Sequence, residues 1–92
     1  MRRFEFKTSF VRCYRALASE DQAKIDRAMQ FLADSLESGP LAHGLGVKKL
    51  RGNVWEMRVD IRQRICFCIK EDIVEFVLLG DHNTIKNYLR NL

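Results

Sequence analysis

Three segments in the second half of the chain have patterns of apolar and polar residues that are typical of β-strands. The odd positions of residues 54–61 are apolar and the even positions are mostly polar, and residues 64–70 repeat this period of two. Except at Glu75, residues 73–79 are apolar on both faces, which favours a central strand covered on both sides. Because the connections between the segments are short, they predict a three-stranded antiparallel meander.

The first half of the chain predicts a strand followed by two helices. Residues 2–6 alternate charged and aromatic side chains, which indicates a short strand. A first helix is expected after a cap at Thr8 or Ser9, and a capping box at residues 19–22 is expected to start the second. The second helix ends before the Gly-Pro pair at 39–40. Since few residues separate the helices, we expect an antiparallel helical hairpin.

The remaining segments complete an α+β fold. The glycine-rich residues 41–47 predict a loop, and Asp81 or Asn83 is expected to cap a short C-terminal helix. The predicted fold has an N-terminal strand, the helical hairpin, the meander forming one small sheet, and this last helix. The hairpin should cover the sheet face that carries Trp55. A chain of 92 residues fits one domain, residues 1–92.

Composition narrows the function further. The net charge of +4 and the pI near 9.2 favour polyanionic partners. No apolar run approaches the length of about 20 residues that spans a bilayer, and no apolar stretch of a secretion signal follows the basic N-terminus. We therefore expect no membrane association. The odd number of cysteines favours a reducing compartment, and we expect the cytoplasm.

A metal or cofactor site is not expected from the sequence. Cys66 and Cys68 lie two residues apart on one strand face, which is not the spacing of a structural zinc knuckle. A site that adds Cys13 or His43 is the weaker alternative. The sequence also has no phosphate-binding glycine loop and no dinucleotide fingerprint.

Five polar residues form a candidate site for RNA cleavage on the other sheet face and at its rim. Glu56 and Arg58 share one strand face, Arg64 lies on the next strand, and His82 and Tyr88 follow the last strand. Transesterification at an RNA phosphate needs a base, an acid and cations that stabilise the phosphorane. Glu56 or His82 provides the base, His82 provides the acid, and the two arginines hold the phosphate.

Each of these residues also has a plainer interpretation. Glu56 and Arg58 are often a solvated cross-strand pair, and a histidine in a loop is often only exposed. Tyr88 has helical spacing with Ile85 and is equally suited to the core. The basic residues that precede the first strand of the meander are either a solvated loop or a docking edge for a nucleic-acid backbone. These residues are Lys48, Lys49 and Arg51.

Four short motifs, in this order and spacing, resemble the RelE/ParE superfamily of bacterial and archaeal toxins. The motifs are Lys49-Leu50-Arg51-Gly52, Trp55-Glu56-Met57-Arg58-Val59, Arg64-Ile65-Cys66-Phe67 and Gly80-Asp81-His82. The resemblance covers essentially the whole chain and is strongest from Lys48 to Tyr88. It implies a ribosome-dependent mRNA endonuclease that a cognate antitoxin neutralises by covering its basic face. It also implies that the protein contacts operator DNA only through the antitoxin complex.

The resemblance assigns a role to each candidate residue. Arg64 matches a phosphate-binding arginine, and Arg58 matches a strand position that often carries a basic catalytic group. His82 matches a position occupied by arginine or histidine, and Tyr88 matches a functional aromatic residue near the C-terminus. Glu56 is similar to the carboxylate of branches with a Glu/His arrangement. The lysine-rich RelE pattern is absent, which leaves the individual roles open.

The sequence therefore predicts the toxin of a type II toxin–antitoxin system that cleaves mRNA by acid–base chemistry without a metal or cofactor. A ParE-like toxin that inhibits DNA gyrase is the first alternative, and an inactive RNA-binding member of the fold is the second. The presence of Arg64, His82 and Tyr88 together argues against the ParE-like alternative.

Overall fold

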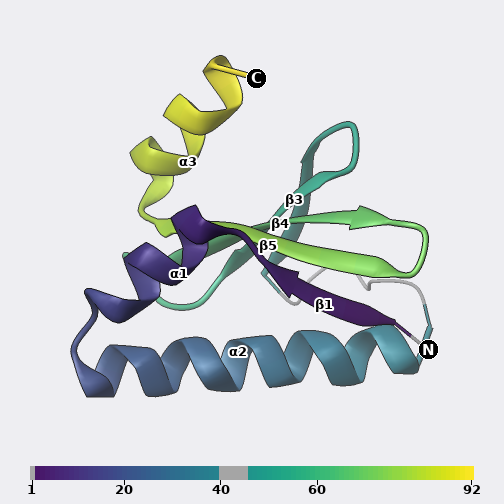
Figure 1. Cartoon of the computed structure of the whole chain (residues 1–92), viewed down its shortest axis with the longest axis horizontal. Coiled ribbons are helices and arrows are strands. Elements are labelled where there is room, and N and C mark those ends of the chain that lie inside the picture. The colour runs from purple at the N-terminus through teal and green to yellow at the C-terminus, as the bar shows by residue number, and fades with distance from the viewer. Residues whose placement is uncertain (1, 40–45) are drawn as a thin grey trace.

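A computed structural model describes residues 2–39 and 46–92 and shows one five-stranded sheet in the order β1-β5-β4-β3-β2 (Figure 1). Strands β2 to β5 form an antiparallel meander, and β1 joins β5 in parallel. The order of elements confirms the predicted α+β fold. The elements are β1 (Arg3–Phe6), α1 (Thr8–Arg15), α2 (Ser19–Glu37), β2 (Val47–Arg51), β3 (Val54–Arg58), β4 (Arg64–Lys70), β5 (Ile73–Gly80) and α3 (His82–Arg90).

The meander has one strand more than predicted, because the basic segment before β3 forms strand β2 instead of a loop. Val47 pairs with Met57 and Lys49 pairs with Trp55 across the two strands. Lysines and arginines are common on edge strands, where they discourage further pairing, and here they hide the apolar alternation. Val47 belongs to β2 and not to the loop expected over residues 41–47. Residues 41–45 of that loop lie outside the described part of the chain.

Strand β3 is shorter than predicted because a turn begins after Arg58. The carboxylate of Asp60 accepts hydrogen bonds from the backbone amides of Arg62 and Gln63, at 2.8 and 2.7 Å. This turn, which the Asp60 side chain stabilises, takes the place of the strand pairing that would have continued β3. Ile61, which the alternation assigned to the buried face, is instead 86% exposed.

Both helices of the first half begin without the side-chain caps that the sequence predicts. The N-cap of α1 is Lys7, and the N-cap of α2 is Ala18. Gln22, which a capping box would turn back onto its own helix, donates its side-chain amide to the carbonyl of Tyr14 at 2.9 Å. It therefore ties α2 to α1, which compensates in part for the missing caps.

Figure 1 shows α1 and α2 as a splayed hairpin, with α2 running along one side of the sheet. Within residues 2–39 and 46–92, no helix combines the length and the apolar character that a bilayer span would need.

The main hydrophobic core lies between this helical hairpin and the sheet, as predicted. Phe67 and Phe76, from the two central strands, are almost fully buried there. The rest of this core consists of aliphatic and aromatic side chains and Met57, whose burial stabilises the fold. It comprises Phe10, Ile25, Leu32, Leu36, Val47, Met57, Ile65, Val74 and Leu79.

A smaller apolar cluster lies on the opposite face of the sheet, beneath α3. It comprises Val54, Cys66, Cys68, Val77 and Ile85. A β-bulge in β5 contributes to it, because Cys66 pairs with Leu78 while Phe67 pairs with Phe76. Val77 is the extra residue, so Val77 and Leu78 both pack on the α3 side. The helix covers only part of this face, which leaves room for charged side chains beside it.

Candidate active site

An ion pair between Glu56 and Arg64 lies on the face of the sheet that carries α3. The Arg64 Nε atom is 3.3 Å from Glu56 Oε1, and the side chains of Arg64 and Glu56 are only 15% and 13% exposed. Strand register explains the contact, since Glu56 faces Cys66 and Arg64 lies two residues before it on β4. The sheet thus holds a carboxylate and a guanidinium together in a largely enclosed position.

His82, the first residue of α3, lies on the same side of the sheet as this pair. The N-cap Asp81 accepts hydrogen bonds from the backbone amide and the hydroxyl of Thr84, at 2.8 and 2.9 Å. These hydrogen bonds from Thr84 keep the pKa of Asp81 below its ordinary value. The cap fixes where the helix starts and therefore where His82 lies.

His82 lines two hollows, one of which also contains Glu56 and the other Arg64. The hollow on the Glu56 side has a volume of about 180 Å³ and an apolar floor. Its remaining lining residues are Lys48, Leu50, Ile85, Lys86 and Leu89. The hollow on the Arg64 side, of about 450 Å³, is lined by the polar residues Arg62, Asp81 and Asn83 and by Ile61. An elongated polar ligand can therefore contact all three candidate groups at once.

Gly80 allows α3 to start close to the sheet. A Cβ atom at this position would lie 2.6 Å from Cγ2 and 2.7 Å from Cβ of Thr84. Thr84 is held by its hydrogen bonds to Asp81 and has little freedom to move. Because Gly80 faces Arg64 across the ladder, the absent side chain is what lets the helix bring His82 to the arginine.

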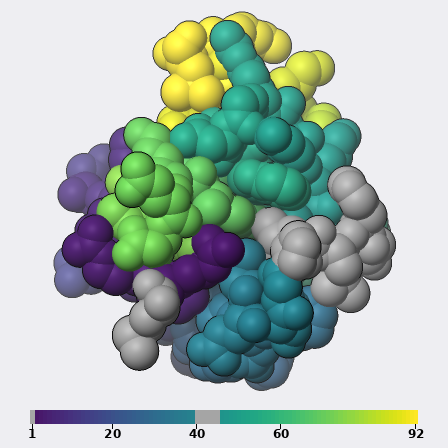
Figure 2. Space-filling model, turned by 90° about the vertical axis from the view of Figure 1, so that its right-hand side faces the viewer, coloured from purple at the N-terminus to yellow at the C-terminus, as the bar shows by residue number. Residues whose placement is uncertain are grey.

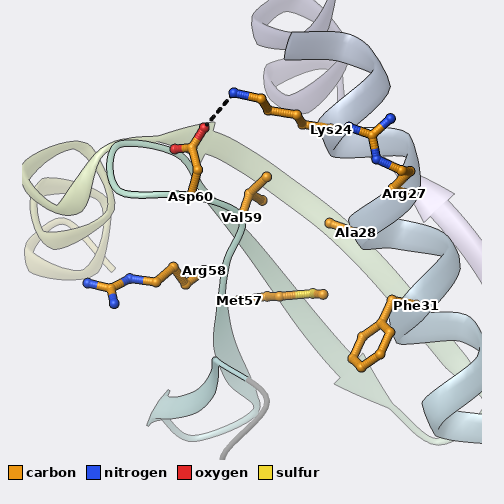
Figure 3. Close-up of a pocket in the computed structure, with 8 residues that line it drawn as sticks. All are labelled: Lys24, Arg27, Ala28, Phe31, Met57, Arg58, Val59 and Asp60. Carbon is orange, nitrogen blue, oxygen red and sulfur yellow. Dashed lines mark hydrogen bonds and ion pairs between the residues drawn. The ribbon is translucent and has the colours of Figure 1, made fainter. Parts of the chain in front are cut away.

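The structure does not bring Tyr88 and Arg58 into the group formed by Glu56, Arg64 and His82. Tyr88 packs against the apolar cluster under α3, and burial, with a smaller contribution from Cys68, raises the pKa of its hydroxyl. Arg58 pairs with Arg64 in the ladder but is exposed. Its side chain points away from α2 (Figure 3), so it is at the edge of the site and is free to contact a ligand.

The three basic residues assigned to RNA binding divide between the two faces of β2. Lys48 faces Glu56 and lines the smaller hollow. Arg51 donates to the carbonyl of Leu89 at 3.2 Å and so joins β2 to α3. Lys49 points to the other face, where its Nζ lies 5.9 Å from the centre of the Trp55 ring. Lys48 therefore lies at the candidate site, Arg51 contacts the far end of α3, and Lys49 lies on the opposite face.

Sequence reasoning missed Lys86 and Arg62. Lys86 lies one turn after His82 in α3, and an i to i+4 spacing places both side chains on one helix face. That spacing was visible in the sequence once a helix from His82 was accepted. Arg62 lies in the turn between β3 and β4, where no periodicity indicates a direction.

Other clusters in the described residues are less suited to chemistry. Burial, followed by the neighbouring Cys68 and Glu56, raises the pKa of the Cys66 thiol to about 12, so this cysteine is a poor nucleophile. No group of three or more histidine, cysteine or acidic side chains in residues 2–39 and 46–92 is arranged to hold a metal ion. The alternative ligand His43 lies outside these residues.

A hollow of about 430 Å³ opens between α2 and the end of β3 on the opposite side of the sheet. Figure 3 shows Lys24 and Asp60 across its rim, joined at 3.4 Å, with Phe31 and Met57 facing the space. The carboxylate of Asp60 already accepts hydrogen bonds from Lys24 and from the backbone amides of the β3–β4 turn. The arrangement is that of a tether between α2 and the β3–β4 turn, not that of an acid–base site.

Solved structures of toxins from toxin–antitoxin complexes have the same fold. YafQ of the E. coli DinJ–YafQ complex superimposes with a TM-score of 0.70 at 16% identity, over 92% of this chain and 98% of that chain. A chain of the RelB–RelE antitoxin–toxin complex from Methanococcus jannaschii gives 0.66 at 21% identity, over 91% and 96%. The YoeB–YefM complex from Staphylococcus aureus gives 0.66 at 14%, over 89% and 98%.

No protein-family model and no curated protein matches the sequence. At identities of 14 to 21% these structural neighbours agree with the chain in fold, over nearly the full length of both partners. The chain therefore has the fold of the YafQ, RelE and YoeB toxins, as the four sequence motifs led us to expect.

Proposed function

We propose that this protein is the toxin of a toxin–antitoxin pair and that it cleaves mRNA on the ribosome. The observation that carries the proposal is the enclosed Glu56–Arg64 ion pair with His82 beside it, between two hollows. The shared fold supports the coarser part of the proposal, because YafQ, RelE and YoeB have each been solved in complex with a partner antitoxin. A cytoplasmic location follows from the proposed substrate.

The three groups supply what RNA transesterification requires. The guanidinium of Arg64 binds the scissile phosphate and stabilises the charge of the phosphorane. When the phosphate takes over the guanidinium, Glu56 loses its ion-pair partner and becomes a better proton acceptor. Glu56 removes the proton of the 2′-hydroxyl, and His82 in its protonated form donates a proton to the leaving 5′-oxygen. The products are a 2′,3′-cyclic phosphate and a 5′-hydroxyl.

The two hollows fit the nucleotides on either side of that phosphate. The apolar floor of the smaller hollow suits the face of a base, and Lys48 and Lys86 at its rim suit the adjoining backbone. The polar hollow, with Arg62 and Asn83, suits a ribose and phosphate. Both hollows are open to solvent, so an RNA strand held in an extended form, as in a ribosomal decoding site, would be cut better than free RNA.

The decisive experiment offers purified protein to ribosomes that carry a defined mRNA with an empty A site. We expect cleavage within the A-site codon that leaves a cyclic phosphate and continues in the presence of a metal chelator for as long as the ribosomes stay intact. The His82→Ala variant should leave the mRNA uncut. Arg27→Ala, which removes a cation from the α2 side of the sheet, should cut like the unchanged protein.

Intact mRNA under conditions in which YafQ or YoeB cuts would refute the nuclease proposal. If the same preparation instead produced gyrase-dependent DNA breaks, the alternative of a gyrase inhibitor would replace it. If neither target were affected and expression did not slow growth, the protein would be an inactive RNA-binding member of the fold.

A further inference from the structure

The turn between β3 and β4 carries the most exposed large apolar side chain among the described residues. Ile61 is 86% exposed and belongs to neither apolar cluster of the fold. Single exposed apolar residues are common on protein surfaces, so exposure alone assigns no role to it. The position of Ile61 is more informative, because it lines the hollow that contains Arg64 and His82.

Hydrogen bonds hold this turn in one shape. The Oδ1 atom of Asp60 accepts the backbone amides of Arg62 and Gln63, at 2.8 and 2.7 Å. The backbone amide of Val59 closes the turn by donating to the carbonyl of Gln63 at 2.9 Å. Ile61 lies at the centre of this hydrogen-bonded turn, so a fixed backbone presents its side chain to the solvent.

A second contact of Asp60 ties the turn to the body of the protein. Its other carboxylate oxygen, Oδ2, lies 3.4 Å from Nζ of Lys24 on α2 (Figure 3). The two oxygens of Asp60 thus have separate tasks, since Oδ1 shapes the turn and Oδ2 joins it to the long helix. An ion pair this exposed contributes little to stability, so its main effect is to fix where the turn lies.

The groups around Ile61 suit a ligand that is both anionic and apolar. Two arginines line the hollow: Arg64 in the ion pair described above, and Arg62, which makes no ion pair within the described residues. Asp81 is the one carboxylate among the lining residues, and one of its oxygens already accepts two hydrogen bonds from Thr84. A nucleotide fits this set, because guanidinium groups bind its phosphate and an apolar side chain packs on the face of its base.

We propose that the β3–β4 turn grips the nucleotide next to the scissile phosphate: Ile61 packs on the face of its base, and Arg62 binds the phosphate on its far side. This role of the turn rests on the nuclease function proposed above and adds the groups that hold the substrate on the Arg64 side. An aliphatic side chain that contacts a base also separates that base from its neighbour in the stack. The grip therefore selects which phosphate meets Arg64 and His82.

The test measures cleavage of ribosome-bound mRNA over a range of protein concentrations. The ratio of the saturating rate to the half-saturating concentration gives the cleavage efficiency, and a series of further mRNAs each lack one base within two nucleotides of the cleaved bond. On the natural codon, Ile61→Ser should lower the efficiency about tenfold, and Ile61→Leu should keep it within about twofold. On the mRNA that lacks the contacted base, Ile61→Ser should match the unchanged protein within about twofold.

Two more variants separate the contacts of the turn. Arg62→Gln should lower the efficiency by the same factor on every mRNA of the series, because the phosphate remains when a base is removed. Asp60→Ala releases the turn and should lower the efficiency on the natural codon about as much as Ile61→Ser does. Adding Ile61→Ser to Asp60→Ala should cost less than about twofold more, since Asp60 acts through the residues of the turn.

Phe31→Ser is the matched control, because it also replaces an exposed apolar residue by serine. Phe31 is 47% exposed on α2, whose blue atoms lie at the opposite end of the molecule from the yellow atoms of α3 in Figure 2. Its cleavage efficiency should stay within about twofold of that of the unchanged protein. Circular dichroism and thermal melting verify that each variant folds.

Two results would overturn the proposed grip while the nuclease function stands. One is an Ile61→Ser variant that cuts the natural codon as well as the unchanged protein does. The other is an effect of Ile61→Ser that is equally large on every mRNA of the series. If the unchanged protein itself left the natural mRNA intact, the nuclease proposal would fail and the grip would fall with it.

Discussion

The two faces of the sheet differ in what covers them and in what they leave exposed. The face beneath α1 and α2 is filled with large apolar side chains, and its core extends across strands β2 to β5. The face beneath α3 has a small cluster with two cysteines, and the enclosed ion pair of Glu56 and Arg64 lies beside it. The long helix covers the core of its face and leaves a hollow at the end of β3 that holds no acid–base group free of partners, whereas the hollows beside the short helix contain Glu56, Arg64 and His82.

This difference shows that a small domain can place the residues that stabilise it and the residues of its proposed site on opposite faces of one sheet. Glu56 and Met57 are consecutive residues of β3, yet they point to opposite faces, and Met57 is only 3% exposed. One position contributes to the proposed site and the next contributes to the core. Four predictions test whether the separation is as sharp as this arrangement suggests.

The largest expected effect is on the α3 face. Glu56→Gln removes the carboxylate charge but keeps the shape of the side chain, so we expect cleavage of ribosome-bound mRNA to fall by about 10²- to 10⁴-fold. The free energy of unfolding should fall by about 1–3 kcal/mol, because the enclosed guanidinium of Arg64 loses its counter-charge but keeps the amide oxygen as a hydrogen-bond acceptor. Single-turnover cleavage and urea titration measure the two quantities on the same sample. A large loss of stability would mean that the two faces are not separable.

The second prediction concerns the neighbouring residue on the α2 face. Met57→Ala leaves a cavity in the main core and should destabilise the protein by about 2–5 kcal/mol. At low temperature, where the variant is still folded, its cleavage rate should stay within about threefold of the unchanged protein, since no group of the site is lost. Urea unfolding and cleavage at 10 °C would test this. A stable variant that does not cut would reverse the roles of the two residues.

The third prediction concerns Gly80, where α3 begins close to the sheet. Gly80→Ala introduces a Cβ atom 2.6 Å from Thr84, and overpacking of this kind costs about 1–3 kcal/mol. Because the start of α3 must shift, cleavage should fall more than the loss of stability explains when it is measured far below the melting temperature. Gly80→Ala combined with Thr84→Ala should restore much of the activity, and no recovery would show that the close approach is not the cause.

The smallest effect is expected at Tyr88. Its side chain packs on the apolar cluster that contains Cys66 and Cys68, so Tyr88→Phe should change cleavage by less than about twofold, in contrast with general acids and bases. Parallel cleavage assays with His82→Ala set the scale. A loss comparable to that of His82→Ala would return Tyr88 to the catalytic group that the family resemblance assigned to it.

Much of the fold could be predicted because apolar periodicity is strong in α2, β4 and β5. The failures occurred where another kind of interaction replaces periodicity. Strand β2 carries lysines on both faces as an edge strand, and the carboxylate of Asp60 ends β3 early by capturing two backbone amides. The cap of α2 was missed because Gln22 bonds to a neighbouring helix, a tertiary contact that local patterns do not encode.

The site was predictable in part. Alternation along the strands placed Glu56 and Arg64 on one face, and the end of the last strand placed His82 at its rim. Their distances depend on register, which a single sequence does not state. Tyr88 was harder, because the same helical spacing suits a core residue and a catalytic one. The division of Lys48 and Lys49 between two faces became predictable only once β2 was known to be a strand.

The bulge in β5 has a consequence for how this protein tolerates change in length. Val77 is the one residue that shifts the later part of the strand, so that Gly80 meets Arg64 and α3 begins on the correct side. Deleting either Val77 or Leu78 would place Phe76 and Leu79 two residues apart, so both would still face the main core and Gly80 would still meet Arg64. The bulge is therefore a point at which β5 can lose one residue without turning the residues that follow it to the opposite face.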